Sequence, residues 1–378
     1  MRVFMLGWEF PPHSVGGLGR HTYELVKALS RLGIHVDLVL PFEDYEYIPG
    51  VNFHIALLAK IMSIYKIFKK SDFSDLYENL YKQIDSYTKN SVLMGKKEQF
   101  DVIQANDWLT ARAGIELKKI TGKPLIVTIH STEYDRTIGH PWEEIVREET
   151  YAVNNADIVV AVSERLKDQL VKLYGVPADK IVVIHNAIDK SRFDSHKISK
   201  RSKVVLYVGR LSLQKGIDNL IHAFKIVSEH DKDALLYIVG EGPEMKHLIE
   251  LSIDLGLSDK VIFFGRVSEE DMENFYSLAS VFVMPSVSEP FGITALEAVA
   301  SKTPTIVSLQ SGASEILKNV FKVDFWDSQQ IADLIIGLFK YRAVGEVMSN
   351  EAYSELTDIT WENSAKKFID VYNRLVKK

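Results

Sequence analysis

The chain of 378 residues contains no cysteine, which excludes a disulfide framework and thiolate chemistry and fits a cytoplasmic protein. No run of 18 apolar residues is present, and the N-terminus reaches Trp8 and Glu9 too soon for a signal peptide. Basic residues are not in excess either. The formal net charge is −6, so a nucleic-acid partner is not expected.

Apolar runs of strand length recur at helix-sized intervals along the chain. They are continuous rather than alternating, which is typical of parallel strands covered by helices on both faces. They fall in two sets, at 3–6, 36–40, 102–104, 125–129, 158–162 and 181–184, and at 204–208, 235–239, 261–264, 281–284 and 305–307. Amphipathic segments such as 22–32 and 219–229 lie between them. The alternation predicts an α/β fold with parallel sheets.

A polar, charged stretch at 189–203 separates the two sets and is expected to be a linker. The chain length also favours two domains. We therefore expect two Rossmann-like, doubly wound domains, at 1–190 and 201–360, facing each other across a cleft. Ligands of such folds bind at the carboxyl ends of the strands.

Glu289 and Glu297 follow the fourth run of the second set and are separated by seven residues. Glu289 is expected in the loop before a helix, and Glu297 inside that helix, about 12 Å further along its axis. Paired acid/base carboxylates of glycosidases lie about 5 to 9.5 Å apart, so these two are expected to contact different parts of one elongated ligand. The loop amides of Phe291, Gly292 and Ile293 form an anion site. The alternative is structural: a carboxylate at a helix N-terminus and a solvated helix face.

Polar or glycine-rich residues follow the strand ends of the first domain. After the first strand, Gly16 and Gly17 allow backbone amides to approach a ligand closely. This loop is neither a Walker A sequence nor a complete G-x-G-x-x-G, and a tight turn before a helix is the alternative. Other strand ends carry Asn106 with Asp107, His130, and Asn186. A single such residue is commonly structural, but several along one sheet indicate a ligand site.

The second domain opens with Arg210 at a strand end and Lys215 before a helix. A guanidinium fork and a mobile ammonium can bind one pyrophosphate, although two surface cations are the alternative. The loop at Val267 is expected to line the same crevice and to hold a base. An Asp-x-Asp sequence at 231–233 matches a metal motif, but it precedes its strand, so we interpret it as a solvated loop.

Taken together, these motifs resemble those of retaining GT-B glycosyltransferases, namely the glycogen/starch synthase type and the family 4 glycosyltransferases. The resemblance covers nearly the whole chain and rests on VGGLG at 15–19, NDW at 106–108, His130, GRL at 209–211 with Lys215, and the Glu-x7-Glu motif. The opening GWEFPP and the sequence NDWLT are most like glycogen synthase. Many relatives carry His where Gln104 stands and Gly in place of Ala187, which leaves the acceptor open.

The resemblance also implies residue roles. The donor diphosphate would be contacted by Gly16, Gly17, Arg210 and Lys215. Glu289 would contact the donor sugar, Glu297 the ribose, and His130 the transferred sugar. The expected catalytic residues are thus His130, Arg210, Lys215 and Glu289; further donor contacts are Val267, Phe291, Gly292 and Ile293, and the acceptor side comprises Asn106, Asp107 and Asn186.

The implied reaction transfers a glucosyl unit, with retention, from ADP-glucose or UDP-glucose to the non-reducing end of an α-1,4-glucan. No metal or other cofactor is expected. The Arg-Lys pair and helix N-termini would stabilise the departing diphosphate, and a terminal helix at 361–378 would cross back to the first domain.

Other interpretations stay open at this stage. The chain could be a family 4 glycosyltransferase acting on a small sugar, a sugar phosphate or a lipid. A GT-B module that binds without turnover is less compatible with the intact cations and glutamates, and an epimerase of GT-B shape fits the glycine loop and His130 less well. The basic, aromatic segment 55–70 is compatible with a helix on the sheet, a membrane-surface helix or a glucan-binding surface. Membrane association is not expected, and a homo-oligomer is compatible with the sequence.

Overall fold

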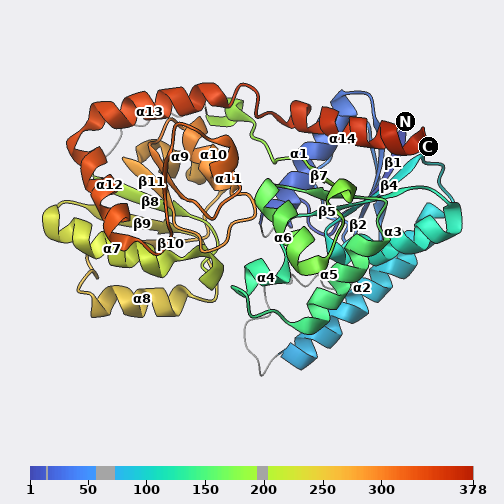
Figure 1. The fold of residues 1–378 in the computed structure, drawn as a ribbon, viewed down its shortest axis with the longest axis horizontal. Helices are drawn as coiled ribbons and strands as arrows, with labels where there is room; N and C mark the ends of the chain where they lie inside the picture. The colour runs from blue at the N-terminus through green and yellow to red at the C-terminus, as the bar shows by residue number, and fades with distance from the viewer. Residues whose placement is uncertain (14–15, 57–72, 194–202, 378) are drawn as a thin grey trace. The chain divides into compact units, whose positions relative to one another are not determined.

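The computed structural model describes residues 1–13, 16–56, 73–193 and 203–377 (Figure 1). The chain divides into two compact units. Unit 1 comprises Met1–Glu133, Trp142–Asn186 and Trp361–Lys378, and unit 2 comprises Tyr134–Pro141 and Ala187–Thr360. Segment 57–72, which contains most of the basic aromatic stretch, lies outside the described residues, as does 194–202 of the expected linker.

Unit 1 is built on a parallel sheet of seven strands in the order β3-β2-β1-β4-β5-β6-β7. The strands are β1 (Arg2–Leu6), β2 (His35–Leu40), β3 (Val51–Ile55), β4 (Val102–Asn106), β5 (Leu125–Ile129), β6 (Ile158–Ala161) and β7 (Ile181–Val183). The helices are α1 (Gly17–Arg31), α2 (Phe73–Gly95), α3 (Trp108–Thr121), α5 (Glu143–Asn155), α6 (Glu164–Tyr174), the 3-10 turn η2 (Ala178–Lys180) and α14 (Trp361–Val376). The central strands β4 and β5 are buried along their whole length, because α1 packs with α14 and α2 with α3 around the sheet (Figure 1).

Unit 2 is built on a parallel sheet of six strands in the order β10-β9-β8-β11-β12-β13. The strands are β8 (Val204–Val208), β9 (Leu235–Val239), β10 (Val261–Gly265), β11 (Val281–Met284), β12 (Thr305–Ser308) and β13 (Phe321–Val323). The helices are α7 (Ile217–His230), α8 (Met245–Asp254), α9 (Glu269–Leu278), α10 (Ile293–Ala300), α11 (Ala313–Ile316), α12 (Ser328–Lys340) and α13 (Arg342–Glu355), with 3-10 turns η3 (Lys190–Phe193) and η4 (Leu213–Lys215). Helix α4 (Glu133–Arg136) begins at the end of the first segment of unit 1 and continues in unit 2. Helix α7 packs on α12, and α10 contacts α9 and α13.

The strand order of each sheet reverses next to its first strand. In unit 1 this point lies between β1 and β4, and in unit 2 between β8 and β11. At such a reversal the loops leave the two strands toward opposite faces of the sheet, which opens a crevice at the carboxyl ends where ligands bind. The loops after β8 and β11 carry Arg210, Lys215 and Glu289, so the second sheet directs the predicted donor residues to its reversal point.

The predicted α/β class with two doubly wound parallel sheets is confirmed, and all eleven predicted strands are present, with ends within two residues of those expected. Four details differ. The edge strands β3 and β13 were not predicted, and the stretch interpreted as a linker contains η3. Helix α1 begins at Gly17 instead of residue 22, and Asn106 ends β4 instead of following it. Among the described residues, no helix has both the length and the apolar character needed to cross a bilayer.

Candidate active site

The loop after β8 places Lys215 beside the carboxylate of Glu289. Lys215 ends the 3-10 turn η4, and Gly216 follows with a φ of +59°, a left-handed conformation that favours glycine. A Cβ on Gly216 would lie 2.3 Å from the carbonyl oxygen of Pro285, so the chain after β8 passes directly against the chain after β11. The backbone bond from Val287 to Gln214 (2.9 Å) fixes the same approach.

Glu289 is buried and receives two side-chain hydrogen bonds at one oxygen. Lys215 Nζ lies 2.6 Å from Glu289 Oε2, and Ser286 Oγ donates to the same oxygen at 3.1 Å. The backbone of Glu289 is held as well, because its amide donates to Gln310 and its carbonyl accepts from Gly312, each at 3.0 Å. An ammonium and a carboxylate thus share one half-buried position at the end of β11.

The N-terminus of α10 follows directly. Gly292 is the N-cap residue, with a φ of +101°, and a Cβ there would meet Met284 Cε at 2.8 Å and Glu289 Cγ at 3.2 Å. Because the cap is glycine, no side chain accepts from the first-turn amides that begin at Ile293. The positive end of the helix dipole therefore lies next to the Lys215–Glu289 pair, an arrangement suited to an anion. Phe291 is buried beside it.

Glu297 lies one helical turn further and has a different partner. The hydroxyl of Tyr276, on α9, donates to Glu297 Oε2 at 2.8 Å. Tyr276 is fully buried, and burial first, then the negative charge of Glu297, raises the pKa of its hydroxyl well above the usual value. The two glutamates of the motif therefore have different protein partners, and their contacts with different parts of one ligand stay a prediction.

Arg210 and Val267 follow β8 and β10, which lie on either side of β9 in the sheet. The Tyr207 hydroxyl donates to the carbonyl of Arg210 at 2.9 Å, and burial, then the charge of Glu289, raises the pKa of Tyr207 well above the usual value. The residue after each strand bonds to the end of the next strand in the sheet: the Gly209 amide donates to the Val239 carbonyl of β9 (3.0 Å), and the Gly240 amide to the Gly265 carbonyl of β10 (2.8 Å). Val267 follows β10 by two residues and is half-buried.

In unit 1, His130 and Asn186 both contact a residue that sequence reasoning missed, His21 of α1. The His21 and His130 rings lie 4.4 Å apart, edge to face. His21 Nδ1 donates to Asn186 Oδ1 at 2.7 Å. Burial lowers the pKa of His21 to about 4, and burial together with His21 lowers that of His130 well below 6.5, so both rings are neutral at pH 7. The Nε2 atoms of both rings are buried, and within the described part of the chain neither has a hydrogen-bond partner.

The remaining predicted residues of unit 1 lie near the same strand ends. Asn106 is fully buried, and its amide accepts from Gln104 Nε2 (3.0 Å) and donates to Thr22 Oγ1 (3.3 Å). Asp107 caps α3 with a φ of +69° and accepts from the Trp108 amide at 2.7 Å. These hydrogen bonds give both residues structural roles, and their acceptor-side roles stay predictions.

The glycine pair of unit 1 opens helix α1. Gly16 is the N-cap residue, and Gly17 is the first residue of the helix. A Cβ on Gly16 would meet nothing within 4 Å, so this position is open. The preceding residues 14 and 15 of the expected glycine loop lie outside the described part of the chain.

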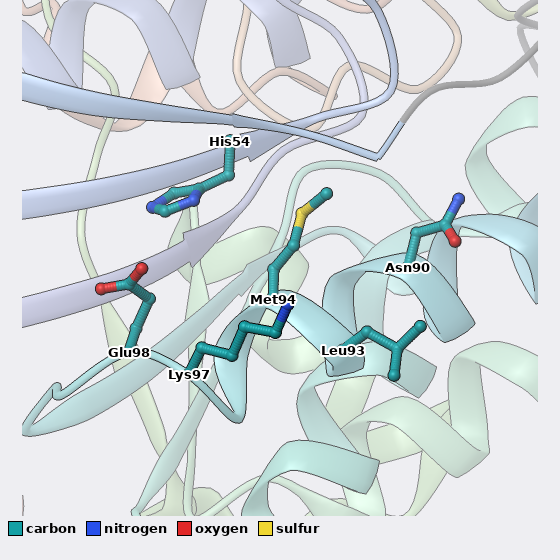
Figure 2. A pocket seen from close by; sticks show the side chains of 6 residues that line it. All are labelled: His54, Asn90, Leu93, Met94, Lys97 and Glu98. Carbon is teal, nitrogen blue, oxygen red and sulfur yellow. The ribbon is translucent and has the colours of Figure 1, made fainter.

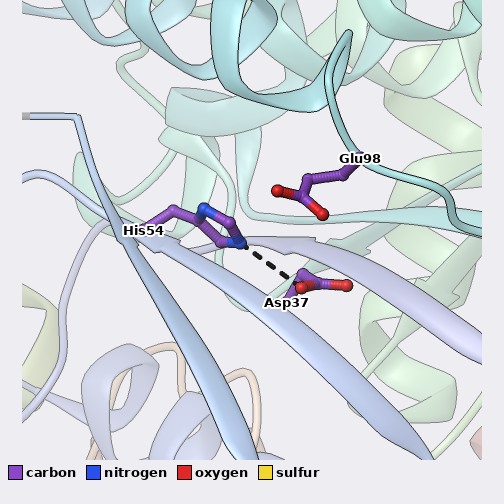
Figure 3. A group of neighbouring side chains, drawn as sticks. All are labelled: Asp37, His54 and Glu98. Atoms are coloured by element: carbon purple, nitrogen blue, oxygen red, sulfur yellow. Dashed lines mark hydrogen bonds and ion pairs between the residues drawn. The ribbon is translucent and has the colours of Figure 1, made fainter.

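One further group of side chains has the composition of a cation site. Within the described residues, only Asp37, His54 and Glu98 bring three candidate ligand atoms within 4.8 Å of one another (Figure 3). Arg2 already supplies positive charge there, with its guanidinium 3.2 Å from Asp37 and 3.7 Å from Glu98. His54, Asn52 and Arg2 together lower the pKa of Asp37, against the effect of its burial.

A pocket of about 260 Å³ adjoins this group (Figure 2). Its lining residues are His54, Asn90, Leu93, Met94, Lys97 and Glu98. None of them is a predicted site residue, so the pocket does not coincide with the candidate active site. The Asp-x-Asp sequence likewise already pairs with a cation: Lys203 Nζ lies 2.9 Å from Asp231 and 3.6 Å from Asp233.

Sequence reasoning missed three residues that contact the predicted ones. The sequence contained a signal for His21, because this residue shares the apolar face of α1 with Leu18 and Leu25. A polar side chain on such a face needs a hydrogen-bond partner to offset the loss of hydration. Ser286 also carried a signal, as a hydroxyl at the end of β11. Tyr276 carried none, because its contact with Glu297 joins two helices through the tertiary fold.

Two family models match the chain: Glycosyltransferase Family 4 at residues 15–192 and Glycosyl transferases group 1 at 189–355. An uncharacterized glycosyltransferase of Methanocaldococcus jannaschii is 34% identical, with 98% of each chain covered. The chain therefore belongs to the group 1/family 4 glycosyltransferases and is a glycosyltransferase enzyme.

More distant relatives differ in their named products. A glycogen synthase of Mycobacterium tuberculosis is 29% identical over 84% of this chain and 80% of its own, and a mannosylfructose-phosphate synthase of Agrobacterium fabrum is 27% identical over 94% and 85%. Among solved structures, sucrose-phosphate synthase of Thermosynechococcus elongatus superimposes with a TM-score of 0.84 at 22% identity, covering 100% of this chain and 99% of its own. Anabaena HepE in complex with UDP-glucose gives 0.74 at 19% identity, covering 99% and 100%. Both structures share the fold.

Proposed function

We propose that this glycosyltransferase transfers a glucosyl unit, with retention of configuration, from ADP-glucose or UDP-glucose to the non-reducing end of an α-1,4-glucan. The observation that carries the donor half is the grouping of Lys215, Glu289 and the glycine-capped N-terminus of α10 at the β8/β11 reversal point. A cation and a helix N-terminus suit a diphosphate, and an adjacent carboxylate suits sugar hydroxyls. The UDP-glucose bound to the similarly folded HepE supports the same donor class.

In this proposal the bond between the anomeric carbon and the diphosphate oxygen breaks, and its electrons remain on the diphosphate. Lys215 and Arg210, with the α10 amides, stabilise the negative charge that develops there. The acceptor hydroxyl attacks from the same face, and its proton passes to the departing diphosphate oxygen. Glu289 contacts the donor sugar, Glu297 the ribose, and neutral His130 the transferred sugar. No side chain forms a covalent intermediate.

The glucan acceptor is proposed from the GWEFPP and NDWLT sequences and from the glycogen synthase relative. A sugar phosphate is the second candidate, because a mannosylfructose-phosphate synthase is similar over more of this chain.

A donor and acceptor screen tests these assignments. The protein would be incubated with ADP-glucose, UDP-glucose and GDP-mannose, each with glycogen, with glucose 6-phosphate, with fructose 6-phosphate or alone. Release of nucleoside diphosphate and incorporation of radiolabelled sugar would be measured. Labelled glycogen from a glucose donor supports the proposal, whereas a product formed only with a sugar phosphate supports the second candidate. If no mixture released a nucleoside diphosphate, both candidate functions would be contradicted. Lys225→Ala, a substitution outside the candidate site, should give the same products as the wild type.

A further inference from the structure

Tyr276 is fully buried, and its hydroxyl contacts Glu297 from the protein interior. The ring packs 5.7 Å from that of Phe282 on β11 and 6.2 Å from that of Phe193. The backbone is fixed too, because Thr303 Oγ1 donates to the Tyr276 carbonyl at 2.7 Å. With no exposed surface, the side chain has little freedom to move.

The hydroxyl is the only polar atom of that side chain, and it donates to Glu297 Oε2 at 2.8 Å. Glu297 itself is only half-buried, so its carboxylate is anchored from the protein interior while part of the side chain reaches the surface. The two oxygens of a carboxylate offer about four acceptor positions, and the Tyr276 hydroxyl occupies one of them.

We infer that Tyr276 is a positioning residue that orients Glu297 to accept hydrogen bonds from the vicinal hydroxyls of the donor ribose. This inference rests on the proposed function, which assigns the ribose to Glu297. A glutamate has three rotatable side-chain bonds, and the anchored hydroxyl orders them before the nucleotide arrives. Ordering in advance lowers the entropy cost of binding, so the effect belongs to nucleotide affinity rather than to the chemical step.

The test compares nucleotides with and without the ribose hydroxyls. Calorimetric titration would give the Kd of UDP and ADP and of their 2′,3′-dideoxy analogues for wild type, Tyr276→Phe, Glu297→Ala and the double variant. Tyr276→Phe removes only the hydroxyl. We expect the preference for the ribose form to fall about tenfold in that variant, with kcat within about twofold. If Tyr276 acts through Glu297, the double variant binds no more weakly than Glu297→Ala.

Two controls separate this effect from a loss of folding. Tyr87→Phe removes another buried hydroxyl, which donates to the Val39 carbonyl at 3.2 Å in unit 1, and should leave the preference unchanged. Tyr276→Met fills similar space without a hydroxyl and repeats the measurement should Tyr276→Phe melt early. An unchanged preference in either folded Tyr276 variant would overturn the inference. If Glu297→Ala itself kept the preference, the ribose assignment of the proposed function would fail first.

Discussion

At the scale of single residues, the Lys215–Glu289 pair determines what the candidate site can bind. In the structure the ammonium is held by a carboxylate at 2.6 Å. A diphosphate carries more negative charge than Glu289 and can draw the same ammonium toward the N-terminus of α10. Lys215 is a flexible point charge and can move between the two anions, whereas an arginine fork could not do so without a new geometry.

Replacing Lys215 by alanine should slow turnover far more than it lowers stability. Loss of a charge that stabilises the departing diphosphate is expected to raise the barrier by about 2–4 kcal/mol. Lys225, half-buried on α7 and paired with Glu229 at 3.3 Å, provides the matched control, and Lys225→Ala should change stability by no more than about 0.5 kcal/mol and leave kcat unaltered. Steady-state kinetics of both variants test whether Lys215 stabilises the departing diphosphate. A near-normal kcat in Lys215→Ala would show that Lys215 is only a structural ion-pair partner of Glu289.

The two glutamates should fail in different ways because their partners differ. Glu289→Ala is expected to lower kcat, since its contact lies next to the reacting carbon. Glu297→Ala is expected to weaken binding of the donor and of the free nucleoside diphosphate, since both contain the ribose. Kinetics combined with calorimetry separate these effects, because a uniform loss of binding appears in KM and a transition-state loss in kcat. Normal turnover in Glu289→Ala, or unchanged diphosphate affinity in Glu297→Ala, would refute the respective role.

His21 should make the stability of the protein depend on mildly acidic pH. Its pKa is 6.5 in an unfolded chain and about 4 in the folded one, so between these values the unfolded state binds more protons. Stability is therefore intact above about pH 6.5, falls as the pH drops toward 4 and levels off below. The full loss is about 3 kcal/mol, and His130 adds to it in the same direction. Urea midpoints measured from pH 7 to pH 4 should fall less steeply in His21→Gln, and equal slopes in the two proteins would contradict the assignment.

The positions of site residues in the fold were predictable from the sequence where these residues follow the ends of strands. Arg210, Lys215 and Glu289 could be placed because a continuous apolar run locates the end of a buried strand, and parallel strands bring their ends together. The partner Tyr276 was not found, since its contact with Glu297 arises from the tertiary fold, and Ser286 was missed although it follows the end of β11. The buried amide of Asn106 bonds to Gln104 and Thr22, and its predicted acceptor-side role stays a prediction.

At the scale of elements, the central strands were predictable and the edge strands were not. A strand buried on both faces gives a continuous apolar run in the sequence. In β3, apolar and polar residues alternate instead, with Val51 buried and Asn52 exposed, because β3 is an edge strand that pairs only with β2. Strand β13 is only three residues long and pairs only with β12. Its sequence therefore carries too little apolar pattern to distinguish it from a loop.

The turn between η4 and α7 should not tolerate a side chain. In Gly216→Ala, the new Cβ would combine a φ of +59° with a contact of 2.3 Å to the Pro285 carbonyl. Gly256 is the matched control, since it has a φ of +69° and nothing within 4 Å of its Cβ position. Gly256→Ala should cost about 1–2 kcal/mol from the left-handed conformation alone. Gly216→Ala should cost more and also weaken nucleotide binding, because it moves Lys215 away from Glu289. Equal unfolding free energies would show that the loop relaxes without effect.

At the scale of the whole molecule, the class of enzyme followed from the sequence while the acceptor did not. The two positions at which the chain departs from many relatives, Gln104 and Ala187, are both buried. Gln104 bonds to Asn106 and to Tyr372 of α14, so its side chain links β4 to the terminal helix. The contacts around these two positions depend on the tertiary fold, which sequence patterns do not specify.

Transfer should proceed without a divalent metal. Within the described residues, Asp37 and Glu98 of the candidate cation group already pair with Arg2, and Asp231 of the Asp-x-Asp sequence already pairs with Lys203. The diphosphate would likewise be neutralised by Lys215, Arg210 and the N-terminus of α10, which perform the electrostatic task that a metal ion performs elsewhere. The transfer rate in excess EDTA is therefore expected to stay within about twofold of the rate with magnesium or manganese. A tenfold or greater loss that one specific ion restores would instead show that these cations are insufficient, and Asp231→Asn and Asp37→Asn variants would then reveal which carboxylate group binds the ion.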